Sequence, residues 1–106
     1  MRFENRVAII TGGTSGIGLA TAELLSAEGA RVVLMGRDPS RGQEAAERIA
    51  SAGGEAIFVQ GDVCLGADCQ RCVAMAVETY GRLDILFNNA GVIHVNRNLV
   101  DTSEAR

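Results

Sequence analysis

Four short, largely apolar runs alternate along the chain with three longer segments of mixed polarity. The runs are Val7–Ile10, Arg31–Met35, Ala56–Val59 and Ile85–Phe87. Continuous apolar runs of this length are typical of strands that are buried on both faces of a parallel sheet. The segments between them, at about 17–28, 39–52 and 68–80, repeat apolar residues at helical spacing. The pattern therefore predicts the order βαβαβαβ.

This alternation, with its short connections, determines the expected topology. Strand–helix–strand units predict parallel pairing with right-handed crossovers. We expect an α/β fold with a parallel sheet in the order 3-2-1-4 and helices on both faces. A chain of 106 residues has room for one such domain, covering residues 1–106.

The spacing also predicts which side of each helix faces the sheet. In the first helix the apolar face comprises Ile17, Ala20, Leu24 and Leu25. In the third helix it comprises Cys69, Cys72, Val73, Ala76, Val77 and Tyr80. Asp38 followed by Pro39 predicts a capped start for the second helix. From Gly91 onward the periodicity ends, and we expect a polar loop.

Composition and charge exclude several classes of partner. The chain is 47% hydrophobic with a single proline, which is typical of an ordered globular domain. A formal net charge of −3 gives no general attraction to nucleic acid or to an anionic membrane, so we expect neither partner. No apolar run is long enough to span a membrane or to serve as a signal peptide. We therefore expect a cytoplasmic protein.

The segment Thr11–Gly18, which reads TGGTSGIG, lies between the first strand and the first helix. Glycine takes positive φ easily and, lacking Cβ, lets a ligand approach the backbone closely. The helix that follows presents unpaired N–H groups and the positive end of its dipole to an anion. A glycine-rich turn in this position predicts a phosphate-binding site in a dinucleotide-binding fold.

Three motifs together resemble the short-chain dehydrogenase/reductase family. Thr11–Gly18 matches its TGxxxGxG motif, Gly61-Asp62-Val63 matches the acidic turn after the third strand, and Asn88–Gly91 matches its NNAG motif. Gly81–Leu86 is similar to the segment that precedes the fourth strand in that family. The resemblance covers essentially the whole chain but less than half of a family member, and it implies a Rossmann-like fold that is truncated before its second half is complete.

The resemblance also implies roles for individual residues, all at the carboxyl ends of strands, where open α/β sheets bind ligands. Asp62 would accept a hydrogen bond from the adenine amino group, with Val63 packed nearby. Asn88 would help to hold the strand ends together. The residues that would cradle the pyrophosphate and riboses, or line that turn, are Gly12, Thr14, Ser15, Gly16, Ile17 and Gly18. Those that would follow the adenosine ribose are Asn89, Ala90 and Gly91.

The end of the second strand bears on the choice between NAD and NADP. An acidic residue there binds the ribose 2′-hydroxyl, whereas an arginine accommodates a 2′-phosphate. In this family the acidic residue would fall at Gly36, and Arg37 follows. Asp38 is better explained as a helix cap. The sequence therefore favours NADP, with NAD as the alternative if Arg37 is only a solvated surface residue.

The family's catalytic tyrosine and the lysine four residues after it have no counterpart here. All ten basic residues are arginine, and the only tyrosine, Tyr80, is followed four positions later by Asp84. We therefore expect the cofactor site of an oxidoreductase that interconverts alcohols and ketones or aldehydes, without catalytic residues in this chain. The small alcohol or carbonyl substrate would bind only to the full-length protein. His94 is most simply a solvated loop residue.

Two other function classes remain open. The first is a non-catalytic module that binds or senses a nucleotide. The second is a redox or metal protein built on Cys64, Cys69 and Cys72, whose C-x4-C-x2-C spacing resembles part of an iron–sulfur site. No fourth cysteine is present, and buried cysteine behaves as a small apolar residue. We therefore predict no metal site.

The last residues suggest a chain that is part of a longer one. Residues 101–104, DTSE, have the pattern of a capping box that begins another helix, two residues before the chain ends at Arg106. In that case the strand Ile85–Phe87 would have no neighbour at its far edge. Exposed edges invite strand pairing, so we expect self-association through the fourth strand.

Overall fold

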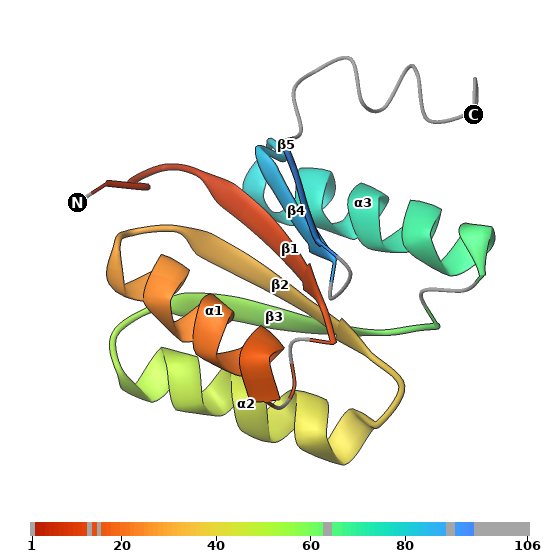
Figure 1. Cartoon of the computed structure of the whole chain (residues 1–106), viewed down its shortest axis with the longest axis horizontal. Coiled ribbons are helices and arrows are strands. Elements are labelled where there is room, and N and C mark those ends of the chain that lie inside the picture. The colour runs from red at the N-terminus through yellow and green to blue at the C-terminus, as the bar shows by residue number, and fades with distance from the viewer. Residues whose placement is uncertain (1, 13, 15, 63–64, 89–90, 95–106) are drawn as a thin grey trace.

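A computed structural model of the chain describes residues 2–12, 14, 16–62, 65–88 and 91–94. Strands and helices alternate along it, and a fifth strand ends the described part (Figure 1). The strands are β1 Val7–Thr11, β2 Arg31–Gly36, β3 Glu55–Gln60, β4 Ile85–Asn88 and β5 Gly91–His94. The helices are α1 Gly16–Ala27, α2 Pro39–Ser51 and α3 Gly66–Tyr80.

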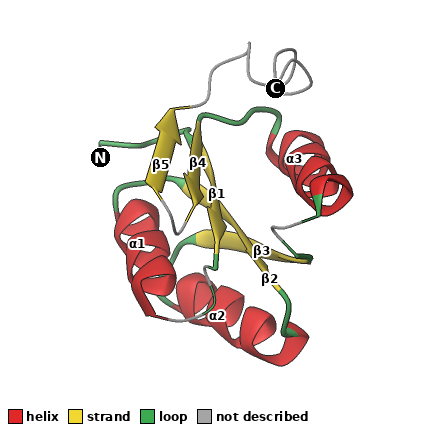
Figure 2. Ribbon diagram, turned by 45° about the vertical axis from the view of Figure 1, so that its right-hand side comes forward, coloured by secondary structure: helices red, strands yellow, loops and turns green. Residues whose placement is uncertain are grey.

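The five strands form one sheet in the order β3-β2-β1-β4-β5. The first four are parallel, so the predicted order 3-2-1-4 is confirmed. At the centre of the sheet Ile9 pairs with Val33 on one side and with Leu86 on the other. The helices α1 and α2 cover one face, and α3 covers the other (Figure 2). This arrangement brings the carboxyl ends of β1, β2 and β3 together at one edge.

Both faces of β1 and β2 are buried, as their continuous apolar runs predict, whereas most residues of β3 and β4 are only partly buried. Val7, Ile9 and Val33 point toward α3 and pack with Cys72 and Ala76. The alternate strand residues pack instead against α1 and α2. They include Ala8, Ile10, Val32 and Leu34, and all are fully buried.

Close packing of α2 depends on one glycine. A Cβ placed on Gly42 would lie 2.3 Å from the ring of Phe58 in β3, so the ring occupies the space that a side chain would need. At the start of the same helix, the Asp38 side chain accepts hydrogen bonds from the backbone N–H groups of Ser40 and Arg41. The predicted cap is confirmed.

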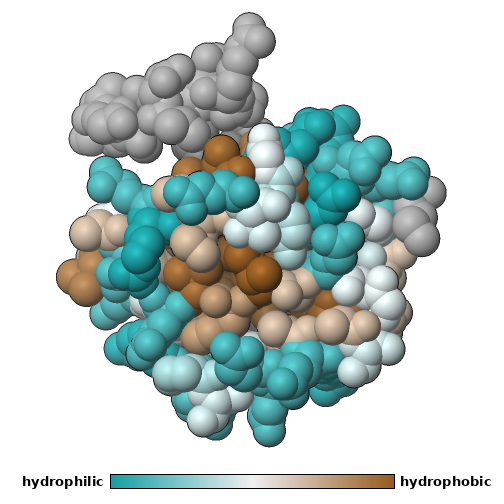
Figure 3. Space-filling view, turned by 180° about the vertical axis from the view of Figure 1, so that it is seen from behind, coloured by the Kyte–Doolittle hydropathy of each residue, from teal (hydrophilic) through white to brown (hydrophobic). Residues whose placement is uncertain are grey.

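The predicted apolar face of α1 is wrong at three positions, because Ile17, Ala20 and Leu24 are all exposed. Ile17 is 75% exposed and Leu24 is 69% exposed, whereas the helix is buried through Gly18 and Ala22. Apolar residues occur on more than one side of α1, so their spacing does not select a single face. In α3, Val77 of the predicted stripe is 40% exposed, while Cys69, Cys72 and Ala76 of that stripe line the core. Apolar side chains also gather in the middle of the face seen from behind (Figure 3).

The segment after Asn88 also differs from the prediction. Gly91–His94, expected as a polar loop, forms β5 and pairs antiparallel with β4, with Asn88 opposite Gly91. The far edge of β4 is therefore paired, which contradicts the expected free edge. Backbone N–H and C=O groups along a strand need hydrogen-bond partners, and the β-branched pair Val92-Ile93 suits a strand. β5 is therefore the outermost strand on this side of the described sheet. Self-association of the chain stays a prediction.

Candidate functional site

The candidate site lies where the carboxyl ends of three parallel strands meet. The turn that contains Gly12 and Thr14 follows β1, Arg37 follows β2, and Asp62 follows β3. Segments that are distant in sequence are thus brought to one edge of the sheet. In open α/β folds this is the edge at which ligands bind.

The turn after β1 adopts the backbone conformation that its glycines allow. Gly12 has φ of 66° and Gly16 has φ of 60°, both in the left-handed region. The N–H of Gly12 donates to the carbonyl of Met35 at 2.9 Å, which attaches the turn to β2. A Cβ placed on Gly16 would have no atom within 4 Å. The start of α1 therefore faces open space. An anion in that space can interact with the N–H groups of the first turn and with the helix dipole.

Gly36 has a structural reason to be small. A Cβ at this position would lie 3.2 Å from Cγ2 of Thr14, which is closer than ordinary van der Waals contact. Thr14 thus packs over the end of β2. A side chain at residue 36 would therefore require Thr14 to shift by a few tenths of an ångström.

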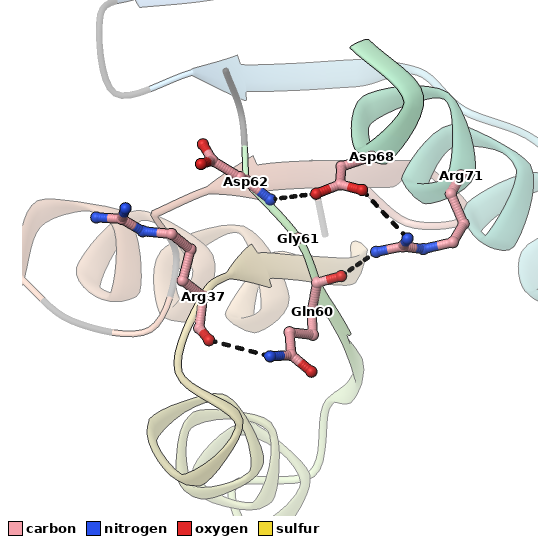
Figure 4. A pocket seen from close by; sticks show the side chains of 6 residues that line it. All are labelled: Arg37, Gln60, Gly61, Asp62, Asp68 and Arg71. Carbon is pink, nitrogen blue, oxygen red and sulfur yellow. Dashed lines mark hydrogen bonds and ion pairs between the residues drawn. The ribbon is translucent and has the colours of Figure 1, made fainter. Parts of the chain in front are cut away.

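A pocket of about 470 Å³ opens beside this turn, between the ends of β2 and β3 and the start of α3. Its lining is polar and carries both signs of charge. The lining residues are Arg37, Gln60, Gly61, Asp62, Asp68 and Arg71 (Figure 4). The side chains of Arg37 and Asp62 extend to the same side of the pocket.

A continuous set of hydrogen bonds holds the pocket wall. The N–H of Gly61 donates to the carbonyl of Gly36 at 2.8 Å, and the side-chain amide of Gln60 donates to the carbonyl of Arg37 at 3.3 Å. The N–H of Asp62 donates to Oδ2 of Asp68 at 2.8 Å. These bonds join the loop after β2, the turn after β3 and the first turn of α3.

Arg71 completes this wall from one turn further along α3. Its guanidinium pairs with Oδ1 of Asp68 at 3.2 Å and donates to the carbonyl of Gln60. Arg37, by contrast, makes no ion pair with any residue that the structure describes. Of the two arginines in the pocket, Arg37 is therefore the one whose charge has no carboxylate partner there.

The structure brings several of the predicted residues together. Gly12, Thr14 and Gly16 lie at the strand edge beside the pocket that Arg37 and Asp62 line. Gly91 lies in β5, opposite Asn88. Ile17 is exposed and Gly18 is buried against the sheet. Four predicted residues fall outside the described part of the chain: Ser15, Val63, Asn89 and Ala90.

Sequence reasoning missed Gln60, Asp68 and Arg71. A partial signal exists, because Asp68 and Arg71 are three residues apart and therefore lie on one side of α3. Nothing in that spacing says that Asp68 reaches back to the N–H of Asp62. That contact depends on how α3 is set against the end of β3.

Tyr80 lies at the opposite edge of the sheet from the candidate site. It ends α3 and packs beside Arg31, which begins β2 and whose guanidinium lies 5.8 Å from the ring centre. Burial, with the charge of Glu55 added, raises the pKa of the Tyr80 hydroxyl. A catalytic tyrosine base needs a lowered pKa. Position and environment therefore agree with a structural role for Tyr80.

The two cysteines that the structure describes, Cys69 and Cys72, lie on α3 and form no disulfide bond with each other. Cys72 is buried in the core, and burial, with the neighbouring Cys69 added, raises the pKa of its thiol to about 12. Cys69 packs against the same core, and Cys64 lies outside the described residues. Among the described residues no group of three or more His, Cys, Asp or Glu is placed to hold a metal ion.

Iodoacetamide is therefore expected to leave Cys72 unmodified in the native protein at neutral pH. A pKa near 12 makes the reactive thiolate roughly a thousandfold rarer than in an ordinary cysteine. Peptide mass spectrometry after timed labelling, with and without urea, measures this, and denaturation should restore labelling. Rapid native labelling of Cys72 would contradict the buried assignment and revive the cysteine-based alternative.

Comparison with known proteins gives consistent results. The model of the short chain dehydrogenase family matches residues 6–106. An uncharacterized oxidoreductase of Thermotoga maritima is 44% identical over 104 residues, and the match covers 98% of this chain and 40% of that protein. Tropinone reductase-like 1 of Erythroxylum coca is 48% identical over 92 residues, covering 87% of this chain and 33% of its own length.

A solved structure shows the same arrangement. The apo form of the glucose dehydrogenase of Caenorhabditis elegans superposes with a TM-score of 0.77 at 39% identity, covering 81% of this chain and 38% of that one. The chain thus spans about two fifths or less of the length of these proteins. Of the helices that the structure describes, none is long and apolar enough to cross a membrane.

Proposed function

The chain belongs to the short-chain dehydrogenase family, and on that premise we propose that it forms the NADP-binding part of an oxidoreductase. The complete protein would interconvert alcohols and ketones or aldehydes by hydride transfer. The observation that carries the proposal is the pocket in which Arg37 and Asp62 face the same side, next to a turn with two glycines at positive φ.

Each part of this edge suits a different part of the dinucleotide. The open space before Gly16 and the N-terminus of α1 suit the pyrophosphate, because N–H donors and the helix dipole both favour an anion. Asp62 suits the adenine amino group, since a carboxylate accepts hydrogen bonds from it. Ser15, Val63, Asn89 and Ala90 remain proposed contacts, with the roles that the family implies.

We assign binding and orientation to this chain, and no catalytic step. The nicotinamide cofactor, when bound, supplies or accepts the hydride. The proton transfer that accompanies it needs an acid–base residue, and the sequence contains neither a lysine nor a tyrosine near the strand edge. The 106-residue chain alone is therefore proposed to bind the cofactor without turnover.

The preference for NADP rests on Arg37 and on the contact between Gly36 and Thr14. A carboxylate that would bind a 2′-hydroxyl is absent at Gly36, where a side chain would press against Thr14. Asp38 is engaged as the cap of α2. Arg37 offers a planar guanidinium that matches the geometry of a phosphate. NAD remains the alternative cofactor.

Replacing Arg37 by alanine is the experiment that tests this proposal. We expect the affinity for NADP to fall about tenfold or more, because one charge-assisted contact to the 2′-phosphate is lost. The affinity for NAD should change little. Isothermal titration of both cofactors measures the difference. Arg41→Ala is the matched control, since Arg41 is an exposed arginine that pairs with Asp38 and lies outside the pocket lining.

The result separates the cofactor assignments. Equal losses of affinity for NADP and NAD would show that Arg37 attracts both dinucleotides only through its charge. No loss of affinity for NADP would favour NAD as the cofactor. A non-catalytic nucleotide sensor is the second candidate function, since binding at this pocket alone needs no acid–base residue. A Tyr-x-x-x-Lys sequence in a continuation beyond residue 106 would decide for the oxidoreductase.

A further inference from the structure

Asp68 lies behind the residue that is proposed to read adenine. Its carboxylate projects from the first turn of α3 and accepts the N–H of Asp62 at 2.8 Å through Oδ2. The Asp62 side chain points away from Asp68 into the other side of the pocket (Figure 4). Asp68 therefore fixes the backbone from which the Asp62 side chain projects, without standing where a ligand would contact Asp62.

Arg71 locks Asp68 in this position and extends the support. It pairs with the second carboxylate oxygen of Asp68 at 3.2 Å and donates to the carbonyl of Gln60. The Gln60 amide in turn donates to the carbonyl of Arg37 at 3.3 Å. One chain of polar contacts thus connects the backbone of Asp62 to the backbone of Arg37.

Gly61 permits this close approach of α3 to the end of β3. It is buried, and a Cβ placed on it would lie 3.2 Å from Cβ of Asp68 and 3.2 Å from Nη2 of Arg71. On its other side the same Cβ would lie 2.9 Å from Cε of Met35. The strand end is therefore held between β2 and the Asp68–Arg71 pair.

We propose that Asp68 and Arg71 are positioning residues that set the selectivity of the pocket for adenine by holding Asp62. This inference rests on the proposed function, because it assumes that Asp62 accepts the adenine amino group. A purely structural explanation competes with it. The N-cap residue Leu65 makes no side-chain hydrogen bond, so Asp68 could simply stabilise the start of α3.

A base-selectivity measurement separates the two explanations. The probes are NADP and its hypoxanthine analogue, in which a carbonyl oxygen replaces the adenine amino group and cannot donate to Asp62. Isothermal titration of the 106-residue chain should give about a tenfold preference for adenine, the worth of one hydrogen bond to a charged group. In Asp68→Ala the preference should fall to nearly one.

Three further variants sharpen the result. Asp68→Asn keeps an oxygen for the Asp62 N–H and should recover most of the preference. Arg71→Met keeps the aliphatic stem and the Asp62–Asp68 bond, and should reduce the preference partially, which serves also if Asp68→Ala fails to fold. Glu78→Ala removes an exposed carboxylate from the far end of the same helix and should leave the preference unchanged. Circular dichroism checks the fold of each variant.

The outcomes distinguish this inference from the proposed function. If Asp68→Ala and Arg71→Met weaken both probes equally and keep the tenfold ratio, the two residues are only structural and the inference is overturned. If the wild-type chain binds NADP but shows no preference for adenine, Asp62 does not read the base and the inference fails alone. If the wild-type chain binds neither probe, the proposed function fails first.

Discussion

Alanine at residue 16 is expected to lower the affinity for NADP by about a hundredfold. Gly16 begins α1, and a methyl group there would project into open space in front of the helix. That space is where a phosphate must approach the N–H groups of the first turn. Losing one or two hydrogen bonds to a charged group corresponds to this fold-change. Titration of NADP into the Gly16→Ala variant measures it.

Gly53 provides a matched control for backbone strain. Like Gly16, it has positive φ, at 95° against 60°, and a Cβ placed on it would meet no atom within 4 Å. It follows α2 at the opposite edge of the sheet. Both alanine variants should lose about 1–2 kcal/mol of the free energy of unfolding, because a side chain is disfavoured in the left-handed region. Only Gly16→Ala should lose cofactor affinity.

A different pattern would change the interpretation of the glycine turn. If Gly53→Ala weakened NADP binding as much as Gly16→Ala, the loss would reflect general destabilisation. If Gly16→Ala bound NADP normally while its stability fell, the phosphate site would have to lie elsewhere. Urea unfolding of both variants beside the titrations therefore makes the comparison complete.

The strands could be predicted from the sequence because their burial leaves a strong local pattern. Val7–Ile10 and Arg31–Met35 are continuously apolar apart from Arg31, and both faces of these strands are covered. The exposed side of α1 could not be predicted, because apolar residues surround that helix and the contact with the sheet uses Gly18 and Ala22. Small residues let a helix pack closely, but they add little to the hydrophobic periodicity from which a buried face is predicted.

The residues of the candidate site likewise include some whose positions could be predicted from the sequence and some whose positions could not. The positions of Arg37 and Asp62 at one edge could be predicted, because Arg37 follows β2 directly and Asp62 lies two residues after β3, so the topology alone brings them together. Asp68 and Arg71 could not, since their partners Asp62 and Gln60 are reached only through the placement of α3. β5 could not be predicted either, because it forms by pairing with β4 and residues 91–94 show no helical or strand periodicity.

Asp84 makes another contact that the sequence pattern does not predict, and its replacement has the largest expected effect on stability. Its Oδ2 accepts the N–H of Val7 at 2.9 Å, and its own N–H donates to the Val7 carbonyl at 2.9 Å. Arg82 pairs with both carboxylate oxygens at 2.8 Å, and Arg6 approaches at 3.4 Å. One side chain thus joins the start of β1 to the residue before β4.

Asp84→Ala is expected to lower the free energy of unfolding by about 2–3 kcal/mol, because the Val7 N–H and two guanidinium groups lose an ionised acceptor. Urea denaturation at neutral pH measures the change. Glu23→Ala is the control: Glu23 forms an ion pair with Arg48 at 2.6 Å between α1 and α2, but accepts no backbone hydrogen bond that the structure describes. A surface ion pair of that kind contributes less than about 1 kcal/mol.

The effect of Asp84 should also depend on pH, with a definite sign. Burial alone would raise the pKa of its carboxyl group, but hydrogen bonds from Arg82 and Val7, with the charge of Arg82, hold that pKa below its ordinary value. The unfolded chain, with an aspartate pKa of about 3.9, therefore takes up the proton first as the pH falls. The stabilisation by the carboxylate is complete above that value and is lost as the pH falls through the folded pKa.

Comparison of the wild type with Asp84→Asn across this range tests the electrostatic origin of the effect. Asparagine keeps the size and one acceptor oxygen, so the difference in the free energy of unfolding isolates the charge. It should be constant from neutral pH down to the ordinary aspartate range and should shrink below it. A difference that stayed unchanged down to about pH 2 would assign the effect of Asp84 to shape and neutral hydrogen bonding, because the carboxyl group would then have the same pKa in the folded and unfolded states.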